Sequence, residues 1–238
     1  MISFFRKIRN SLLDSGRTGT YILYAFGEIT LVVIGILIAL QINNWNELQK
    51  DRATERTYLM RIQDDLEIDL NSLENILSML DIRLKQYSLV DSLYPLPSEL
   101  QELAVSIDFD FNSLIQTGRQ FRPTIGAYRA LISDGQTNLI RNRDLFANIQ
   151  HIYEIRYDLS KEYAVRADEK SDQLLWSLRS LSRENFRFDE LSSLSDSVLE
   201  DLNYLYTHQN VYRRMLTLSI SLVSQVIDLI QEELENEE

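Results

Sequence analysis

The sequence predicts an all-α protein, in which an N-terminal transmembrane helix precedes a long-helix extramembrane bundle. Only 7 glycines and 3 prolines occur in 238 residues, which is few for a turn-rich β fold. Apolar residues recur every three or four positions over long stretches, as in helices with one buried face. One stretch near the N-terminus is almost continuously apolar. We therefore expect a basic segment at 1–20, a transmembrane helix at 21–42 and an extramembrane helical domain at 43–238.

The first 20 residues combine basic and apolar side chains. Arg6, Lys7, Arg9 and Arg17 stand against one acidic residue, Asp14. Apolar residues lie between them in the order ISFFRKIRNSLL, a pattern that suits a short amphipathic helix on anionic membrane lipid. The alternative is a basic head that only directs membrane insertion.

The predicted transmembrane helix must include a carboxylate. The uninterrupted apolar run from 29 to 42 holds 14 residues. Such a run covers about 21 Å of a hydrocarbon core that is about 30 Å thick. Starting at Tyr21 gives 22 residues and takes in Glu28, and this longer helix measures about 33 Å. Tyr21 and Tyr24 at one end and Trp45 at the other would then lie at the two membrane interfaces.

Glu28 has two interpretations. Its side chain could reach the near lipid headgroups, since helical side chains lean toward the N-terminus. Alternatively, Glu28, Gly35 and Ala39 share one helix face, on which small residues allow a second helix to approach closely. These three residues are the predicted contact between membrane helices.

The charge distribution predicts both orientation and partners. Residues 43–238 hold 20 basic and 34 acidic side chains, and such a body is repelled by phosphate backbones. We therefore expect no nucleic-acid partner. The basic residues before the span favour a cytoplasmic N-terminus, with the body on the opposite side, and the apolar stretch is too long for a cleaved signal peptide.

The N-terminal stretch also resembles a known family. The order YILYAFGEITLVVIGILIALQINNWNE, preceded by FFRKIRNSLL, resembles the signature of a bacterial family of single-pass membrane proteins, common in the Bacteroidota, whose function is unknown. The segment AYRALISDGQTNLIRNRDL continues the likeness more loosely. The resemblance implies an anchor in the bacterial inner membrane and a helical domain in the periplasm. It implies no activity and no catalytic residues.

A seam of apolar residues, spaced three or four positions apart, follows the predicted span. Such spacing is typical of a helix that packs along one face, as in a coiled coil. Nothing between 42 and 46 forces a break, so the helix can run from the span to about residue 93. The seam packs either on later helices or on a second copy, and the apolar faces of the later helices favour packing within the chain. The seam consists of Leu59, Ile62, Leu66, Leu70, Leu73, Leu77, Leu80, Leu84 and Tyr87.

The remaining chain predicts further helices. Pro123 opens a short helix that ends at Asp134 and Gly135, and Asn142 caps a long helix that reaches about residue 182. A serine-rich stretch separates this helix from two more, at about 196–206 and 210–235. On the long helix we expect a buried stripe of Leu145, Ile149, Ile152, Leu159 and Tyr163. On the last helix we expect a buried stripe of Val211, Met215, Leu218, Leu222, Val226 and Leu229.

No motif for catalysis or metal binding is present in the sequence. The chain has no cysteine, and its two histidines, His151 and His208, belong to no group with ligand spacing. Its serines lie in no recognisable motif with a base, and no glycine-rich loop could hold a phosphate. We therefore expect no enzyme, no metal site and no cofactor.

One basic segment stands out in the acidic body. Residues 119–143 contain five arginines against a single acidic residue, Asp134. They could bind an anionic group or the acidic surface of a partner. The favoured interpretation is that they pair with acidic helices of the same domain, for example the stretch 64–69. The five are Arg119, Arg122, Arg129, Arg141 and Arg143.

These patterns favour a membrane-anchored protein that acts as a scaffold or accessory subunit through protein–protein interaction. The expected partners are membrane lipid and other membrane or envelope proteins, or a second copy of the chain in a homo-oligomer. The alternative is a sensory or small-ligand-binding helical bundle in the periplasm, because antiparallel bundles can hold ligands between their helices.

Overall fold

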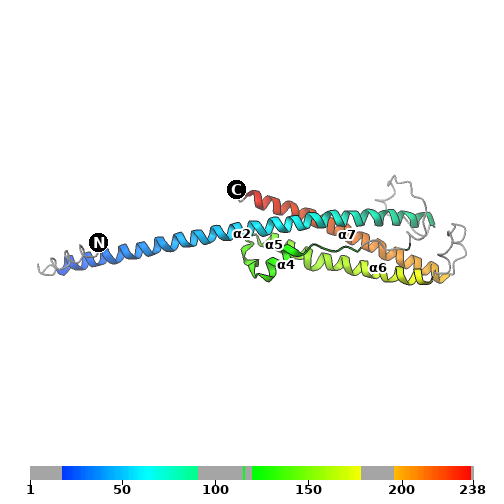
Figure 1. The fold of residues 1–238 in the computed structure, drawn as a ribbon, viewed down its shortest axis with the longest axis horizontal. Helices are drawn as coiled ribbons and strands as arrows, with labels where there is room; N and C mark the ends of the chain where they lie inside the picture. Colours follow the sequence, from blue (N-terminus) through cyan, green and yellow to red (C-terminus); the bar gives the residue numbers. More distant parts are fainter. Residues whose placement is uncertain (1–17, 91–114, 116–119, 178–195, 237–238) are drawn as a thin grey trace. The chain divides into compact units, whose positions relative to one another are not determined.

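The computed structural model describes residues 18–90, 115, 120–177 and 196–236. The N-terminal segment up to residue 17 and Arg119 lie outside the described residues, and for Tyr21 and Tyr24 only the backbone is described. Every element in the described part of the chain is a helix, which confirms the predicted fold class (Figure 1). The elements are α2 (Thr18–Val90), α4 (Gly126–Ser133), the 3-10 turn η2 (Gln136–Leu139), α5 (Arg143–His151), the π-helical turn η3 (Ile152–Arg156), α6 (Tyr157–Ser177) and α7 (Asp196–Asn236).

The chain divides into two units, Met1–Thr54 and Glu55–Glu238. The described part of the first unit is the beginning of α2, whose apolar side chains are exposed. This segment is long and apolar enough to cross a membrane once, and an N-terminal signal sequence has the same properties. The unit boundary reflects packing, whereas the predicted boundary between residues 42 and 43 marks the end of an apolar run and stays a prediction.

The apolar seam on α2 is buried within the chain. Leu70 and Leu77 are half-buried, and all the other seam residues are buried in one core with α6 and α7. The favoured prediction of packing within the chain therefore agrees with the structure. α2 also continues without a break through residues 42–46, as expected from the absence of helix-breaking residues there.

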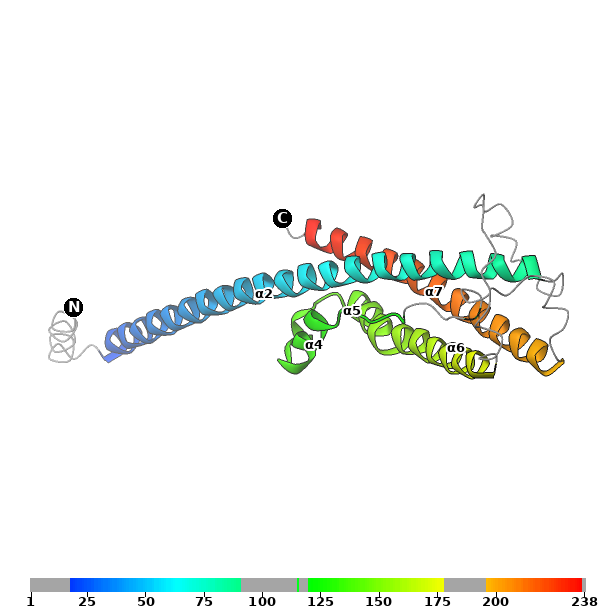
Figure 2. The ribbon, with the colours of Figure 1, turned by 45° about the vertical axis from the view of Figure 1, so that its right-hand side comes forward.

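α7 runs antiparallel to the second part of α2. The Arg56 guanidinium, near the start of the second unit, donates to the carbonyl of Leu234 at 2.8 Å, near the end of α7. At the other end, Arg213 Nε donates to Asp81 Oδ1 at 2.6 Å. The first contact also satisfies a carbonyl that the helix end leaves without a partner. Figures 1 and 2 show the two helices crossing at a shallow angle.

α6 and α7 pack side by side and antiparallel (Figure 2). Lys170 pairs with Asp201 at 2.5 Å, and the buried hydroxyls of Ser160 and Ser219 lie 3.2 Å apart. Ser160 and Ala164 are buried on α6, and small side chains such as these allow the two helices to approach closely. The core of the second unit therefore lies between α2, α6 and α7.

The sequence prediction for α7 was wrong in two respects. Residues 196–236 form one helix rather than two, because no glycine or proline interrupts it near 207–209. Apart from Val226, which is buried as predicted, its buried face is displaced by one residue from the predicted stripe, so that Leu218 is exposed and Ser219 is buried. Ser219 is buried opposite Ser160, with 3.2 Å between the two hydroxyls, so the buried face of α7 includes a polar residue. The buried face contains Tyr212, Leu216, Ser219, Val223, Val226, Ile230 and Leu234.

The predicted stripe on the helix after Asn142 was correct only as far as Ile152. There η3 widens one turn, and the N–H of Tyr157 donates to the carbonyl of Ile152, five residues earlier. The inserted residue rotates the remainder of the helix. Tyr157 and Ser160 are buried as a result, and Leu159 and Tyr163 are only half-buried.

The local predictions for the segment before α5 are confirmed. α4 begins at Gly126, shortly after Pro123, and ends at Ser133 with Asp134 as its C-cap, after which Gly135 takes a left-handed conformation with φ of 68°. Asn142 caps α5, since its side-chain oxygen accepts from the N–H of Leu145 at 3.0 Å.

Candidate functional site

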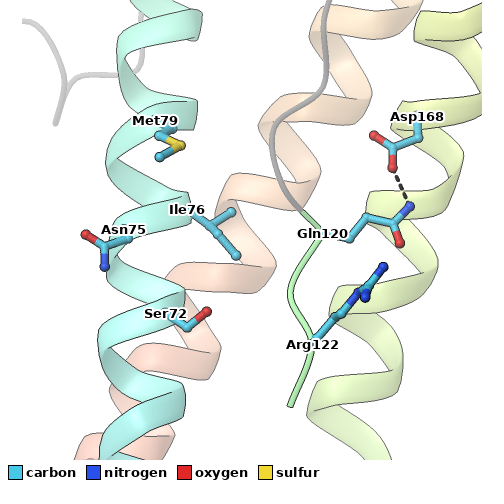
Figure 3. Close-up of a pocket in the computed structure, with 7 residues that line it drawn as sticks. All are labelled: Ser72, Asn75, Ile76, Met79, Gln120, Arg122 and Asp168. Atoms are coloured by element: carbon cyan, nitrogen blue, oxygen red, sulfur yellow. Dashed lines mark hydrogen bonds between the residues drawn. The ribbon is translucent and has the colours of Figure 1, made fainter. Parts of the chain in front are cut away.

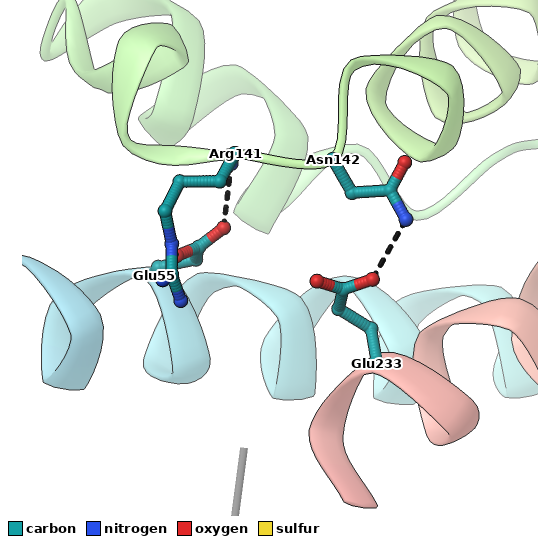
Figure 4. Close-up of polar contacts among 4 residues, drawn as sticks. All are labelled: Glu55, Arg141, Asn142 and Glu233. Carbon is teal, nitrogen blue, oxygen red and sulfur yellow. Dashed lines mark hydrogen bonds and ion pairs between the residues drawn. The ribbon is translucent and has the colours of Figure 1, made fainter. Parts of the chain in front are cut away.

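The polar contacts of the second unit converge on residues 120–142, here called the connector, which contain α4 and η2. Three acidic residues of α2 hold it in place, and the first is Glu55. One oxygen of Glu55 accepts from the Arg141 N–H at 2.7 Å and the other accepts from Arg141 Nε at 2.8 Å (Figure 4). The Glu55 side chain is 1% exposed and that of Arg141 is 48% exposed. This ion pair therefore fixes the connector backbone as well as a side chain.

Asp65 and Asp69 hold the other end of the connector through backbone amides. Asp65 Oδ2 accepts from the N–H of Ala127 at 2.9 Å, in the first turn of α4, where a carboxylate is favoured by the helix dipole. Asp69 Oδ1 accepts from the N–H of Thr124 at 2.8 Å. The sequence favours pairing of the stretch 64–69 with arginines; these two residues instead accept from backbone N–H groups of the connector.

A third set of contacts closes the C-terminal end of the connector. The Asn142 amide nitrogen donates to Glu233 at 2.7 Å, which ties α5 to α7 (Figure 4). The Tyr58 hydroxyl donates to Asp134 Oδ2 at 2.8 Å. The connector is thus bound to both α2 and α7 by side chains that are far away in the sequence.

A cluster of buried tyrosines joins Tyr128 of the connector to Tyr153 of η3 and Tyr157 of α6. The rings of Tyr128 and Tyr153 stack at 4.5 Å, and Tyr157 meets Tyr153 edge to face at 5.4 Å. Burial raises the pKa of Tyr153 and Tyr157, and the negative charge of Asp69 raises both further. The pKa of Tyr128 is raised first by burial and then by its hydrogen bond to Glu154, which measures 2.5 Å. All three hydroxyls therefore stay protonated at neutral pH.

Asp69 is the buried carboxylate of this cluster. It is 1% exposed, and its Oδ2 atom has no hydrogen-bond partner among the described residues. Burial raises the pKa of the Asp69 carboxyl, and the hydrogen bond from Thr124 opposes that shift. No motif in the sequence predicted this residue. A usable signal exists, since Glu55 and Asp69 stand at the three- and four-residue spacing of the seam itself, where an acidic residue is unexpected.

A groove of about 720 Å³ opens between α2, the start of the connector and α6. Figure 3 shows two opposed walls, with the α2 residues on one and the connector and α6 residues on the other. The side-chain nitrogen of Gln120 donates to Asp168. Burial raises the pKa of the Asp168 carboxyl, and the Gln120 hydrogen bond lowers it. The lining residues are Ser72, Asn75, Ile76, Met79, Gln120, Arg122 and Asp168.

The structure separates the arginines that the sequence grouped together. Arg141 is bound to Glu55, whereas Arg122 and Arg129 are exposed and make no ion pair within the described part of the chain. Arg143 is exposed and donates to the carbonyl of Thr137 at 3.3 Å. Among the four arginines of this segment that the structure describes, Arg122 is the one that lines the groove.

The residues predicted to contact another membrane helix lie on the first part of α2. Glu28, Gly35 and Ala39 are exposed, and a Cβ atom added at Gly35 would meet no atom within 4 Å. Trp45, the predicted interfacial anchor that is described with its side chain, is 64% exposed. The face is therefore open within the described residues of this unit.

Neither histidine is among the residues that line the groove. His208 packs on Tyr204 at 4.2 Å, and burial lowers its pKa. His151 ends α5 and is half-buried. Within the described ranges, no three His, Asp or Glu side chains are placed to hold a metal ion. That the protein is not an enzyme stays a prediction.

Comparison with known proteins identifies a family and no function. A model described as a family of unknown function, DUF6090, matches residues 28–213. This range begins at Glu28, within the N-terminal stretch that carries the resemblance, and includes most of the second unit. Searches of curated proteins and of solved structures gave no match. As the sequence resemblance implied, the chain belongs to an uncharacterised family, the family of unknown function DUF6090.

Proposed function

We propose that the protein is a membrane-anchored scaffold or accessory subunit that works through contacts with other envelope proteins. The observation that carries this proposal is the continuity of α2. One unbroken helix bears exposed apolar side chains in the first unit and a buried seam in the second. An apolar surface that no described residue covers requires lipid or another protein around it. The proposal includes no catalytic step.

The proposed location is the inner membrane of a bacterium, with the N-terminus in the cytoplasm and the second unit in the periplasm. The support is the excess of basic residues before the apolar segment. A reporter enzyme that is active only in the periplasm, fused after Trp45, should be active. An inactive reporter beside an active cytoplasmic reporter at the same position would reverse the orientation.

Two surfaces are proposed as contacts. In the first unit, Glu28, Gly35 and Ala39 offer a face on which a partner helix can approach closely. In the second, the exposed side chains of Arg129 and Arg143 offer positive charge to an acidic partner. The partner can be a different protein or a second copy of the chain.

Native mass spectrometry of the full-length protein, extracted from its own membrane in mild detergent, tests the proposal. We expect a stoichiometric complex that is lost when Gly35→Leu and Ala39→Leu are combined, because the larger side chains keep helices apart. Val33→Leu adds bulk on a different face and should leave the complex intact. A monomer in all three samples would contradict the proposal, and equal complexes in all three would contradict the assigned face.

The alternative function is a sensory or ligand-binding bundle. One observation favours it, the groove of about 720 Å³ in the second unit, whose volume lies in the range of small-molecule sites.

A further inference from the structure

We propose that the groove between α2 and α6 binds a small organic monocarboxylate that carries an apolar group, with Arg122 as the ion partner of the carboxylate. This inference rests on the alternative, ligand-binding function. It is independent of the scaffold role, which depends on the first unit and the outward arginines.

The groove has one partly apolar wall and one polar wall. Ile76 and Met79 of α2 supply the apolar surface, and Met79 is 48% exposed. Gln120, Arg122 and Asp168 stand opposite (Figure 3). Sites for small molecules commonly combine apolar surface with a few fixed polar groups in this way. A ligand with an apolar body and a single charged end would match both walls.

Arg122 is held between two anchored residues. Gln120, two positions earlier, donates to Asp168, and the N–H of Thr124, two positions later, donates to Asp69. The backbone at Arg122 is therefore fixed on both sides, so that binding a ligand needs little ordering of the chain. Its guanidinium lines the groove and makes no ion pair with the residues that the structure describes.

The chemistry of Arg122 favours an anion, and its surroundings favour a single negative charge. A guanidinium binds a carboxylate through two parallel hydrogen bonds. Asp168 lines the same groove, and the chain as a whole has a net charge of −12. A dianionic phosphate would be repelled by these charges, whereas one guanidinium can balance one carboxylate. Ser72 and Asn75 supply neutral hydrogen-bond donors on the opposite wall.

The test compares 3-phenylpropionate with its neutral isostere, 3-phenylpropionamide. Both are titrated by saturation-transfer NMR against the full-length protein in phosphatidylcholine nanodiscs, with empty nanodiscs as the blank. We expect saturable binding of the carboxylate and at least about tenfold weaker binding of the amide, since a hydrogen-bonded charge contributes this much or more. Equal affinity for the two probes would overturn the proposal, as would no saturable carboxylate binding up to about 10 mM.

Three variants assign the binding to the groove. Arg122→Gln should weaken carboxylate binding about tenfold, and Met79→Asp, which places a like charge on the opposite wall, should weaken it similarly. Arg129→Gln removes the same charge from an exposed position on α4 outside the groove and should change the affinity less than about twofold. Helical content by circular dichroism confirms folding of each variant. Unchanged binding by Arg122→Gln, or equal losses in Arg122→Gln and Arg129→Gln, would overturn the proposal.

Discussion

The two parts of α2 carry large apolar side chains, but only those of the second part are covered by protein. In the first unit Ile29 is 63% exposed and Leu37 is 59% exposed, whereas Leu66 and Leu73 in the second unit are fully buried. The sequences differ accordingly. Residues 29–42 of the first part are apolar on nearly all sides, whereas the second part is apolar on one side only, which packs on the other helices of its unit.

Polar residues show the same contrast. In the first part of α2 the hydrogen bonds are local, such as Thr30 Oγ1 to the carbonyl of Phe26 and Asn43 Nδ2 to Glu47. The second part has local bonds too, such as Gln63 to Glu67, but its bonds also reach distant residues, as Glu55 does to Arg141, 86 positions away. Local bonds stabilise a helix by itself, whereas distant ones fix a tertiary arrangement. The position of a residue along α2 therefore decides what its loss should cost.

The largest contrast is expected for leucines in the two parts. Leu66→Ala should lower the free energy of unfolding of the second unit by about 2–5 kcal/mol, because it leaves a cavity in the core. Leu37→Ala makes the same change on the same helix but should leave this free energy within about 0.5 kcal/mol, since Leu37 is exposed. Urea unfolding of the full-length protein in detergent, followed by circular dichroism, measures both. Similar losses would show that the two parts of α2 are not stabilised differently.

A second contrast concerns glutamates. Glu55→Ala should cost about 2 kcal/mol, because it leaves the Arg141 N–H without a partner and removes a buried ion pair. The Arg141 side chain is half-exposed, so water can replace part of the interaction that it loses with Glu55. Glu47→Ala, in the first part, breaks only an exposed contact with Asn43 and should stay within about 0.5 kcal/mol. The same unfolding experiment applies, and a smaller loss for Glu55 than for Glu47 would contradict the assigned role.

Aspartates give a smaller contrast. Asp65→Ala removes the carboxylate at the first turn of α4 and should cost about 1 kcal/mol, the usual loss for a helix cap. Asp51→Ala, on the exposed first part of α2, should change stability by less than half of this amount. Hydrogen exchange at Ala127 gives a second measurement, because its N–H is the donor to Asp65. Unchanged protection of that amide in Asp65→Ala would show that the contact does not hold α4.

Features that depend on neighbouring residues were predictable from the sequence. The seam on α2, the unbroken passage through residues 42–46, the Gly135 turn and the Asn142 cap all follow from the order of a few adjacent residues. Each uses a local rule, such as helical spacing or the conformational freedom of glycine. These rules do not depend on what packs against the segment.

The displaced faces of α6 and α7 were not predictable from spacing. A π-helical turn leaves no mark in the sequence, and it moves every later residue of the helix by one position. Ser219 and Ser160 are polar, so a search for apolar stripes passes over both, although each is buried against the other. Only the partner helix explains why a serine lies in the core.

The groove and the acidic residues beneath the connector depend on contacts across more than 50 positions. Asp69 and Thr124 are 55 positions apart, and nothing in either local sequence indicates the other. The basic segment was recognisable in the sequence. That Arg141 binds Glu55, whereas Arg122 lines the groove, could be seen only once the position of α2 was known. The composition of the sequence therefore identified the basic segment, whereas the contacts of each arginine depend on the fold.

The smallest expected effect is a pH dependence that belongs to Asp69. Burial raises the pKa of its carboxyl above the ordinary value of 3.8, so the folded state binds this proton more tightly than the unfolded state does. The contribution of Asp69 to stability is therefore complete below about pH 4 and is lost as the pH rises through the folded pKa. An asparagine side chain at this position could still accept from the Thr124 N–H without carrying a buried charge.

We accordingly expect Asp69→Asn to be at least as stable as the wild type at pH 7, by up to about 1 kcal/mol, and to show a shallower fall in stability between pH 4 and pH 7. Asp168, whose pKa is raised in the same direction, remains in both proteins and cancels in the comparison. Asp64→Asn changes an exposed carboxylate nearby and should keep the wild-type slope. Unfolding free energies across this range measure the difference. Equal slopes in Asp69→Asn and the wild type would mean that burial of the Asp69 charge adds nothing to the pH dependence of stability, and the hydrogen bond from Thr124 would then be the contribution of this residue.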